Sequence, residues 1–287
     1  MKGTAYLLQA SLIMLWWIGL SLDSTFYNAF QFPGIGSNAF NSFFAPDILV
    51  VTFLSIVRAY KHVRELEFVI LGGFAFGTFY CINATILTHG GYLPTTLMIL
   101  GLFYNLFLIF QENIFRESQS KSFVMNGLKT LVQIICIWFI TLFFFPWLLL
   151  QAFAPNTPFL LEPYFAIGSL LFALFSILGL TSAYIMVKNG KGTPLPIDQT
   201  TKLVLTGPYR YVRNPMAIAG VGQGIAVGII FTSMPICIYA LVGALLWQLV
   251  VRPIEEKDLL KRFGEEYEHY QQNIPCWIPR FKNNTTT

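Results

Sequence analysis

The sequence is poor in charged residues. Aspartate, glutamate, lysine and arginine make up 11% of its 287 residues, against about 25% in an average soluble domain. Hydrophobic residues make up 55%, a share typical of a polytopic membrane protein rather than of a water-soluble globule. The net charge of +4 is small and lies in an apolar background, which argues against a nucleic-acid-binding protein.

Cysteine and histidine are also scarce, with four and three residues. The cysteines lie far apart and form no CxxC pair, so the sequence suggests neither a zinc site nor a disulfide framework. We expect no bound metal. Cys276 lies in a polar tail between Pro275 and Trp277, and we interpret it as a bystander thiol. His89 precedes two glycines, which is typical of a turn rather than of a metal ligand.

Long apolar runs dominate the chain. A helix needs roughly 17 to 25 apolar residues to cross a bilayer, and the sequence offers eight candidates, of which the second is short. They are residues 4–22, 47–60, 68–88, 92–111, 130–152, 163–187, 215–233 and 235–251. We therefore expect an all-α, polytopic transmembrane helical bundle of about eight spans.

The basic residues test this number of spans, because cytoplasmic loops of membrane proteins carry an excess of lysine and arginine. With eight spans and both termini in the cytoplasm, all 18 lysines and arginines fall on one side. The opposite loops carry Asp23, Asp47 and Glu162 as their charged residues. The sequence thus predicts a multi-pass protein of a bacterial inner membrane or the endoplasmic reticulum, with cytoplasmic amino and carboxy termini.

A polar segment at 112–129 is the first long break between apolar runs. We place the boundary between two regions near residue 120. Residues 1–120 hold no constellation of reactive side chains, and we interpret them as a transmembrane scaffold or a module that narrows substrate access. Residues 121–287 form a second membrane domain, which carries the candidate site.

The segment 206–216, TGPYRYVRNPM, places two arginines and two tyrosines directly before an apolar helix. Pro215 suits the first helical turn, and Asn214 suits the cap before it. The helix would then point free N–H groups at this segment, an arrangement that attracts carboxylate or phosphate. A structural alternative is that Arg210 and Arg213 anchor the helix at the membrane surface while the tyrosines lie at the interface.

The second polar segment begins at Arg252, where the last apolar run ends. A tight turn near 233–235 makes the two preceding spans a hairpin, so both polar segments return to the same side of the membrane. Pro253 is expected to break or kink the helix. If the helix resumes at once, Glu255 and Glu256 lie on the same side as Arg252.

An apolar stripe follows these glutamates and lies opposite a charged face. Such a pattern predicts an amphipathic cytoplasmic helix that lies on the membrane surface or caps the bundle. The stripe comprises Leu259, Leu260, Phe263, Tyr267 and Tyr270. The charged face comprises Asp258, Lys261, Arg262 and Glu265.

Together these segments resemble the integral-membrane methyltransferases of the isoprenylcysteine carboxyl methyltransferase and phospholipid methyltransferase superfamily. RYVRNPM, the helical hairpin and RPIEE followed by FGEEYEHY carry the resemblance, which covers roughly residues 130–287. It implies S-adenosylmethionine as the cofactor and a lipid-like or prenylcysteine-like methyl acceptor at the cytoplasmic membrane face. The family pattern GxYRYxRHPxY has histidine and a final tyrosine where this chain has Asn214 and Ala217.

The resemblance also implies roles for individual residues. The cofactor-binding residues would be Gly207, Tyr209, Tyr211, Arg213, Asn214, Pro215, Glu255 and Glu256. An ammonium group would pair with Glu255 or Glu256, a carboxylate with Arg213, and a sulfonium with a tyrosine ring. The catalytic candidates are Arg252, as a guide for the acceptor, and Glu256. A thiolate or carboxylate acceptor needs no general base, whereas a phenol or amine would use Glu256.

Two alternatives remain open. A membrane reductase of the steroid 5α-reductase type has a similar carboxy-terminal architecture and uses NADPH, although the order of the RYVRNP, RxxEE and FGEEY patterns favours the methyltransferase. The second alternative is a non-catalytic membrane protein that retains the fold, and Asn214 and Ala217 are the residues that support it. Stabilisation by S-adenosylhomocysteine or by NADP distinguishes these interpretations.

Overall fold

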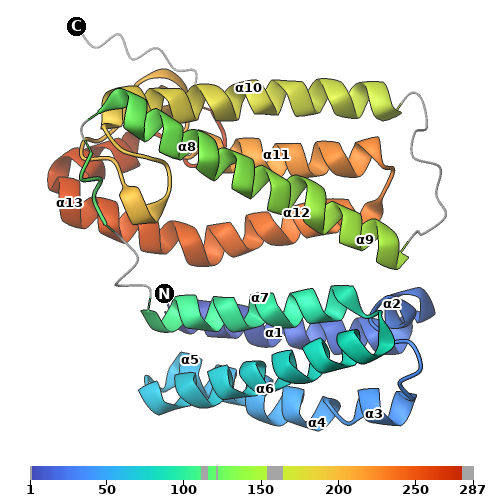
Figure 1. Ribbon diagram of the computed structural model, residues 1–287. Coiled ribbons are helices and arrows are strands. Elements are labelled where there is room, and N and C mark those ends of the chain that lie inside the picture. Colours follow the sequence, from blue (N-terminus) through green and yellow to red (C-terminus); the bar gives the residue numbers. More distant parts are fainter. Residues whose placement is uncertain (1, 111–115, 121, 154–163, 280–287) are drawn as a thin grey trace, which may run out of the picture. The chain divides into compact units, whose positions relative to one another are not determined.

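The computed structural model of the protein is built from helices (Figure 1). It describes residues 2–110, 116–120, 122–153 and 164–279. These ranges contain no β-strand, and two isolated β-bridges join short loop segments. The expected all-α class is therefore confirmed.

The chain divides into two compact units. The first comprises Met1–Gln111 and Leu148–Asn156, and the second comprises Glu112–Trp147 and Thr157–Thr287. Each has its own set of packed helices. The predicted functional division at residue 120, with a scaffold before it and the site after it, stays a prediction.

Buried polar contacts tie the helices of the first unit together. Gln9 donates a hydrogen bond to Ser55 at 2.9 Å and accepts one from Asn105 at 2.8 Å. Arg58 and Glu67 form a buried ion pair. In a bilayer, burying apolar side chains between helices gains little free energy because lipid is itself apolar. Buried polar contacts such as these therefore help to hold the helices together. The helices are α1 (Lys2–Leu22), α2 (Ser24–Ala29), α3 (Ser37–Asn41), α4 (Phe44–Pro46), the π-helical η1 (Asp47–Thr52), α5 (Phe53–Tyr60), α6 (Arg64–Thr88) and α7 (Tyr92–Phe110).

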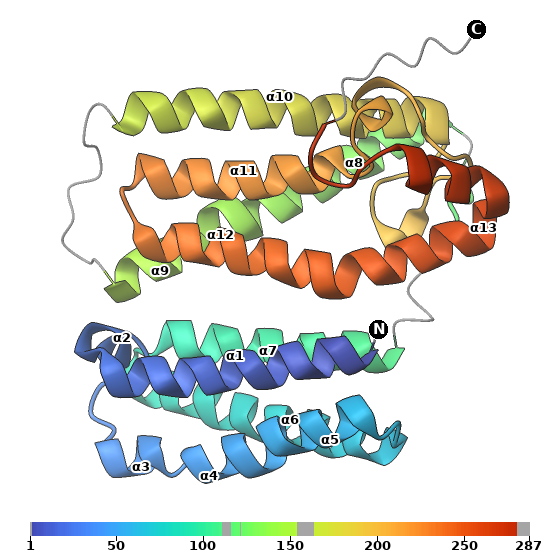
Figure 2. The same ribbon diagram turned by 180° about the vertical axis from the view of Figure 1, so that it is seen from behind.

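In the second unit, α11 lies between α10 and α12 in both views (Figures 1 and 2). Small residues permit this approach: a Cβ atom at Gly224 would lie 2.9 Å from that of Ala240. Gln223 donates to Ser176 on α10 at 2.9 Å. The remaining helices are α8 (Phe123–Trp138), η3 (Phe139–Phe144), α9 (Phe145–Phe153), whose residues from Leu148 onward belong to the first unit, α10 (Tyr164–Gly190), η4 (Pro196–Asp198), η5 (Gly207–Arg210), α11 (Pro215–Ile230), α12 (Met234–Leu246), η6 (Trp247–Val251) and α13 (Arg252–Asn273).

Within the described residues, seven helical segments are long and apolar enough to cross a membrane. They correspond to seven of the eight predicted spans, and α11, with 16 residues, is the shorter eighth. The second span is longer than predicted, since it begins at Ser37 instead of residue 47. The predicted hairpin is present: α12 begins four residues after α11 ends, and the N–H of Ser233 donates to the carbonyl of Gly228 at 2.8 Å.

The helix does not break at Pro253, contrary to expectation. Instead, the π-helical turn η6 leads directly into α13. Proline lacks the N–H of a regular turn, and a π-turn is one way to accommodate that loss. A kink at Pro253, the other expected outcome, stays a prediction. The interruption lies at Gly264, whose φ of 53° and ψ of −130° are not helical. The apolar stripe predicted along α13 is therefore divided, and a position on the membrane surface stays a prediction.

Candidate functional site

The first predicted segment folds as the short 3₁₀ turn η5, followed by α11. Gly207 opens this turn with a φ of +62°, and a Cβ atom there would lie 2.1 Å from Cδ1 of Ile185. The left-handed backbone favours glycine, and a Cβ atom would also force the end of the Ile185 side chain to move. The structure thus gives Gly207 a conformational reason to be glycine.

Tyr209 is buried beneath the same turn. Its hydroxyl lies 3.9 Å from Sδ of Met186, and its carbonyl accepts a 2.6 Å hydrogen bond from the hydroxyl of Tyr270. Burial raises the pKa of Tyr209 well above its usual value. Tyr211, by contrast, is 42% exposed. The two tyrosines of the motif therefore lie in different environments.

The two predicted segments meet through Arg213 and Glu256. Nη1 of Arg213 lies 2.5 Å from Oε1 of Glu256, and Nε of Arg252 lies 3.5 Å from the same oxygen. The second oxygen of Glu256 accepts a 3.0 Å hydrogen bond from Gln271. Both oxygens of this buried carboxylate are therefore engaged by protein groups.

Glu255 has a different environment. Its side chain is half-buried and lines a cavity. Within the described residues its carboxylate makes no hydrogen bond or ion pair. The apolar part of the last span ends at Val251, which leaves Glu255 beyond it. Burial, followed by the charges of Glu256 and Asp258, raises the pKa of Glu255 to about 7.

The start of α11 has no side-chain cap among the described residues. Pro215 is fully buried at the first helical position. Asn214 occupies the cap position as predicted, but its side chain makes no capping hydrogen bond. Its amide nitrogen instead lies 3.8 Å from Sγ of Cys276. The first N–H groups of α11 are thus left without a side-chain cap, next to Met216 and Ala217, which line the cavity.

The cavity has a volume of about 230 Å³ and lies within the second unit. Of the predicted site residues, four line it: Tyr209, Arg213, Asn214 and Glu255. The other predicted residues do not line it, and they are Gly207, Tyr211, Pro215, Arg252 and Glu256. Apolar and aromatic residues that sequence reasoning missed complete much of the wall, among them Ile134, Ile137, Met186, Leu203, Trp247 and Tyr267.

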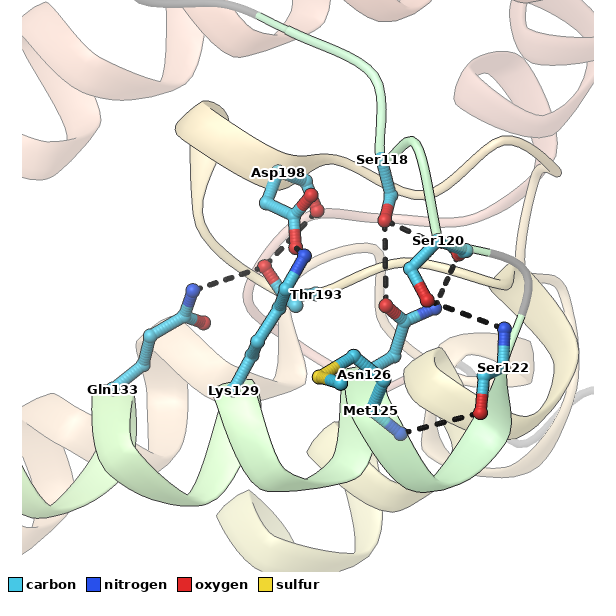
Figure 3. A network of polar contacts seen from close by, with 9 residues as sticks. All are labelled: Ser118, Ser120, Ser122, Met125, Asn126, Lys129, Gln133, Thr193 and Asp198. Atoms are coloured by element: carbon cyan, nitrogen blue, oxygen red, sulfur yellow. Dashed lines mark hydrogen bonds and ion pairs between the residues drawn. The ribbon is translucent and has the colours of Figure 1, made fainter.

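A polar network fixes the glycine- and proline-rich loop between α10 and η5, residues 191–206, which forms one side of the cavity (Figure 3). Thr193 accepts a 3.1 Å hydrogen bond from Gln133 on α8 and donates a 3.0 Å bond to the carbonyl of Asp198. Lys129, one turn before Gln133, forms a 2.9 Å ion pair with the carboxylate of Asp198. The loop is therefore held against α8, and several of its backbone N–H groups are already paired.

Arg262 joins that loop to α13. Its Nε atom lies 2.8 Å from the carboxylate of Asp258, and its Nη1 atom donates a 2.7 Å hydrogen bond to the carbonyl of Thr200. Gln199 donates to the same carboxylate at 3.0 Å. Arg262 was predicted on the charged outer face, but it lines the cavity. In the sequence, only the i, i+4 spacing of Asp258 and Arg262 indicates that these two residues form an ion pair.

Part of the chain that holds these residues is similar to a family of known proteins. Residues 163–266 match the family model described as phospholipid methyltransferase. Over these residues the chain is similar to the membrane methyltransferases of this superfamily. The match contains both predicted segments up to Glu266, and it confirms the resemblance that they carry.

Individual relatives agree with this assignment over part of their length. The chain is 32% identical over 109 residues to methanethiol S-methyltransferase from Crocosphaera subtropica, covering 37% of this chain and 38% of the relative. It is 28% identical over 123 residues to the protein of that name from Pseudomonas deceptionensis, covering 41% and 42%.

A third relative carries a different name. The nickel-cobalt-cadmium resistance protein NccN of Alcaligenes xylosoxydans xylosoxydans is 32% identical over 92 residues, covering 31% of this chain and 42% of the relative. The chain thus spans about two-fifths of the length of these curated relatives. No solved structure gives a significant match.

Proposed function

We propose that the protein is an S-adenosylmethionine-dependent methyltransferase that acts at the cytoplasmic membrane face. The observation that supports this most directly is the cavity-lining set of Arg213, Asn214 and Glu255, which comes from both motifs of a methyltransferase domain. We also propose that both termini are cytoplasmic, because this orientation places the basic loops inside. Residues 1–120 would serve as a scaffold.

The charges around the cavity fit this cofactor. Glu255 presents a carboxylate without a protein partner among the described residues, which suits an ammonium group. The side chain of Arg213 is 10% exposed, and its buried Nε–H has no acceptor within the part of the chain that the structure describes. This group and the uncapped start of α11 would hold a carboxylate. A single cavity would therefore offer complementary partners to both ends of an amino-acid moiety.

Aromatic rings that line the cavity would face the sulfonium, the third charged group of S-adenosylmethionine. Trp247 and Tyr267 line the cavity, and the face of an aromatic ring attracts a cation such as a sulfonium. Tyr211 does not line the cavity. We therefore propose Trp247 and Tyr267 for this role in place of Tyr211.

When bound, S-adenosylmethionine supplies an electrophilic methyl group. The residues of the chain would orient that group and exclude water from it. Glu256 is held by Arg213 and Gln271, so we propose that it fixes Arg213 and does not act as a general base. Arg252 would then guide the acceptor from outside the cavity wall, since it contacts Glu256 and Gln248.

The acceptor is proposed to be a small hydrophobic or lipid-like thiol. Two relatives are named methanethiol S-methyltransferases, which favours a small thiol as the acceptor. The thiolate of such an acceptor is nucleophilic without a general base. Ile134 and Ile137 on α8 provide an apolar wall for its alkyl group.

Transfer of a labelled methyl group tests this proposal. Purified protein would be incubated with labelled S-adenosylmethionine and alkanethiols of increasing length, with alkyl amines and carboxylic acids of matched length as controls. We expect transfer to thiols only. Transfer to the amines or acids instead would contradict the proposed acceptor, and absence of cofactor binding would contradict the enzyme assignment.

A further inference from the structure

The carboxy-terminal tail returns to the site. After α13, residues 275–277 reach back to the beginning of α11 (Figure 2). The backbone N–H of Arg213 donates a 2.9 Å hydrogen bond to the carbonyl of Pro275. Cys276 is buried at 7% exposure beside the amide of Asn214. The tail therefore contacts two residues that line the cavity.

Gln248, in the π-turn η6, anchors the same tail. Its Oε1 atom accepts a 2.7 Å hydrogen bond from Nε1 of Trp277 and a 3.1 Å bond from Nη1 of Arg252. The ring of Trp277 packs edge-on against Trp247, with centroids 5.2 Å apart and an interplanar angle of 86°. Trp247 lines the cavity. One amide oxygen thus links the tail to a predicted catalytic arginine.

These contacts form a closed circuit. Gln248 contacts Arg252, which pairs with Glu256, which in turn pairs with Arg213. Arg213 binds the tail through its backbone, and the tail returns to Gln248 through Trp277. A shift of the tail must therefore move the groups on both sides of the cavity, because close-packed side chains transmit displacement.

We propose that Gln248 and Trp277 are positioning residues of the methyltransferase site. They hold the tail against the cavity-lining residues Arg213 and Asn214, and they fix the orientations of Trp247 and Arg252. The role in ligand binding rests on the proposed function. Docking of the tail does not depend on that function, so the docking and the role in ligand binding can be refuted separately.

The rate at which a maleimide labels Cys276 measures whether the carboxy-terminal tail is docked. In a variant whose other three cysteines are replaced by alanine, Trp277→Phe removes the Nε1–H donor and keeps an aromatic ring. Loss of this partly buried hydrogen bond should raise the rate of maleimide labelling of Cys276 by roughly tenfold. Ile278→Ala is the matched control, because Ile278 is 78% exposed. An unchanged labelling rate in Trp277→Phe overturns the proposal.

Gln248 variants test the positioning role. Gln248→Leu should accelerate labelling of Cys276 and weaken binding of S-adenosylhomocysteine roughly tenfold, whereas Gln248→Glu keeps the acceptor for Trp277 and should restore slow labelling. Faster labelling with unchanged S-adenosylhomocysteine affinity in Gln248→Leu overturns the positioning role. If the unmodified protein does not bind S-adenosylhomocysteine, the proposed function fails, and the labelling rates alone decide whether the tail is docked.

Discussion

Arg213 and Glu256 lie 43 residues apart in the sequence and 2.5 Å apart in the structure. The hairpin of α11 and α12 brings them together, because Arg213 lies just before α11 and Glu256 lies after α12. This ion pair joins the two motifs on one side of the cavity. It also engages the carboxylate of Glu256, which leaves Glu255 as the carboxylate that faces the cavity.

Loss of the Glu256 carboxylate is predicted to destabilise the protein. Glu256→Ala leaves Arg213 and Arg252 without their shared partner, and removing one member of a buried ion pair costs about 3–5 kcal/mol. We expect the Tm in detergent to fall by roughly 5 °C or more. Glu268→Gln, at an exposed position, is the control and should leave the Tm unchanged. Equal Tm values for both variants would show that the ion pair is unimportant.

Loss of the Glu255 charge is predicted to weaken ligand binding with little effect on folding. Glu255→Gln keeps the shape of the side chain and removes the proposed partner of the ammonium group. A hydrogen bond to a charged group is worth about 1.5–3 kcal/mol, so the Kd for S-adenosylhomocysteine should increase about tenfold or more. Titration by calorimetry measures this. A Kd within twofold of the original would remove Glu255 from the binding site.

The same carboxyl group is predicted to make binding pH-dependent. Because its pKa is raised from 4.5 to about 7, Glu255 is mostly neutral below pH 7 and should bind an ammonium group better as the pH rises through that value. The stability of the free protein should change in the opposite direction, falling from about pH 4.5 to about pH 7 as the buried group ionises. Glu255→Gln should abolish both dependences, and a pH profile that survives the substitution would refute this explanation.

Gly207 is predicted to be needed for its backbone conformation. Gly207→Ala introduces a Cβ atom at a φ of +62° and 2.1 Å from Ile185. Strain of this kind costs about 1–3 kcal/mol, and the Tm should decrease. Gly220→Ala is a matched control, since no atom lies within 4 Å of a Cβ atom there. A Gly207→Ala protein as stable as the control would contradict the argument.

The orientation in the membrane is predicted by the basic loops. Asn38 and Lys61 lie at opposite ends of the segment Ser37–Tyr60. A membrane-impermeant maleimide added to intact cells should label Asn38→Cys, on the outer side, and not Lys61→Cys. Permeabilised cells provide the control, in which both variants should react. The reverse pattern in intact cells would invert the proposed topology.

The sequence predicted the helical class, the hairpin and the meeting of the two motifs. These depend on long apolar runs and on a short turn, which leave few alternatives. The assignment of Arg252 to the same helix face as Glu256 was also confirmed by their contact.

Details that depend on helix rotation could not be predicted. The π-turn η6 changes the phase of the residues after Trp247, and it removes the break expected at Pro253. The break at Gly264 depends on a backbone conformation that glycine permits but does not impose. The tail contact through Cys276 and the loop contact through Arg262 join residues that no periodic pattern relates.

The proposal that the cavity lined by Glu255 binds S-adenosylmethionine can be tested by thermal-shift titration. The unmodified protein and Glu255→Gln would each be titrated with S-adenosylhomocysteine and with NADP. S-adenosylhomocysteine should raise the Tm of the unmodified protein, NADP should not, and the shift should be smaller in Glu255→Gln. Stabilisation by NADP alone, or by neither compound, would contradict the proposal.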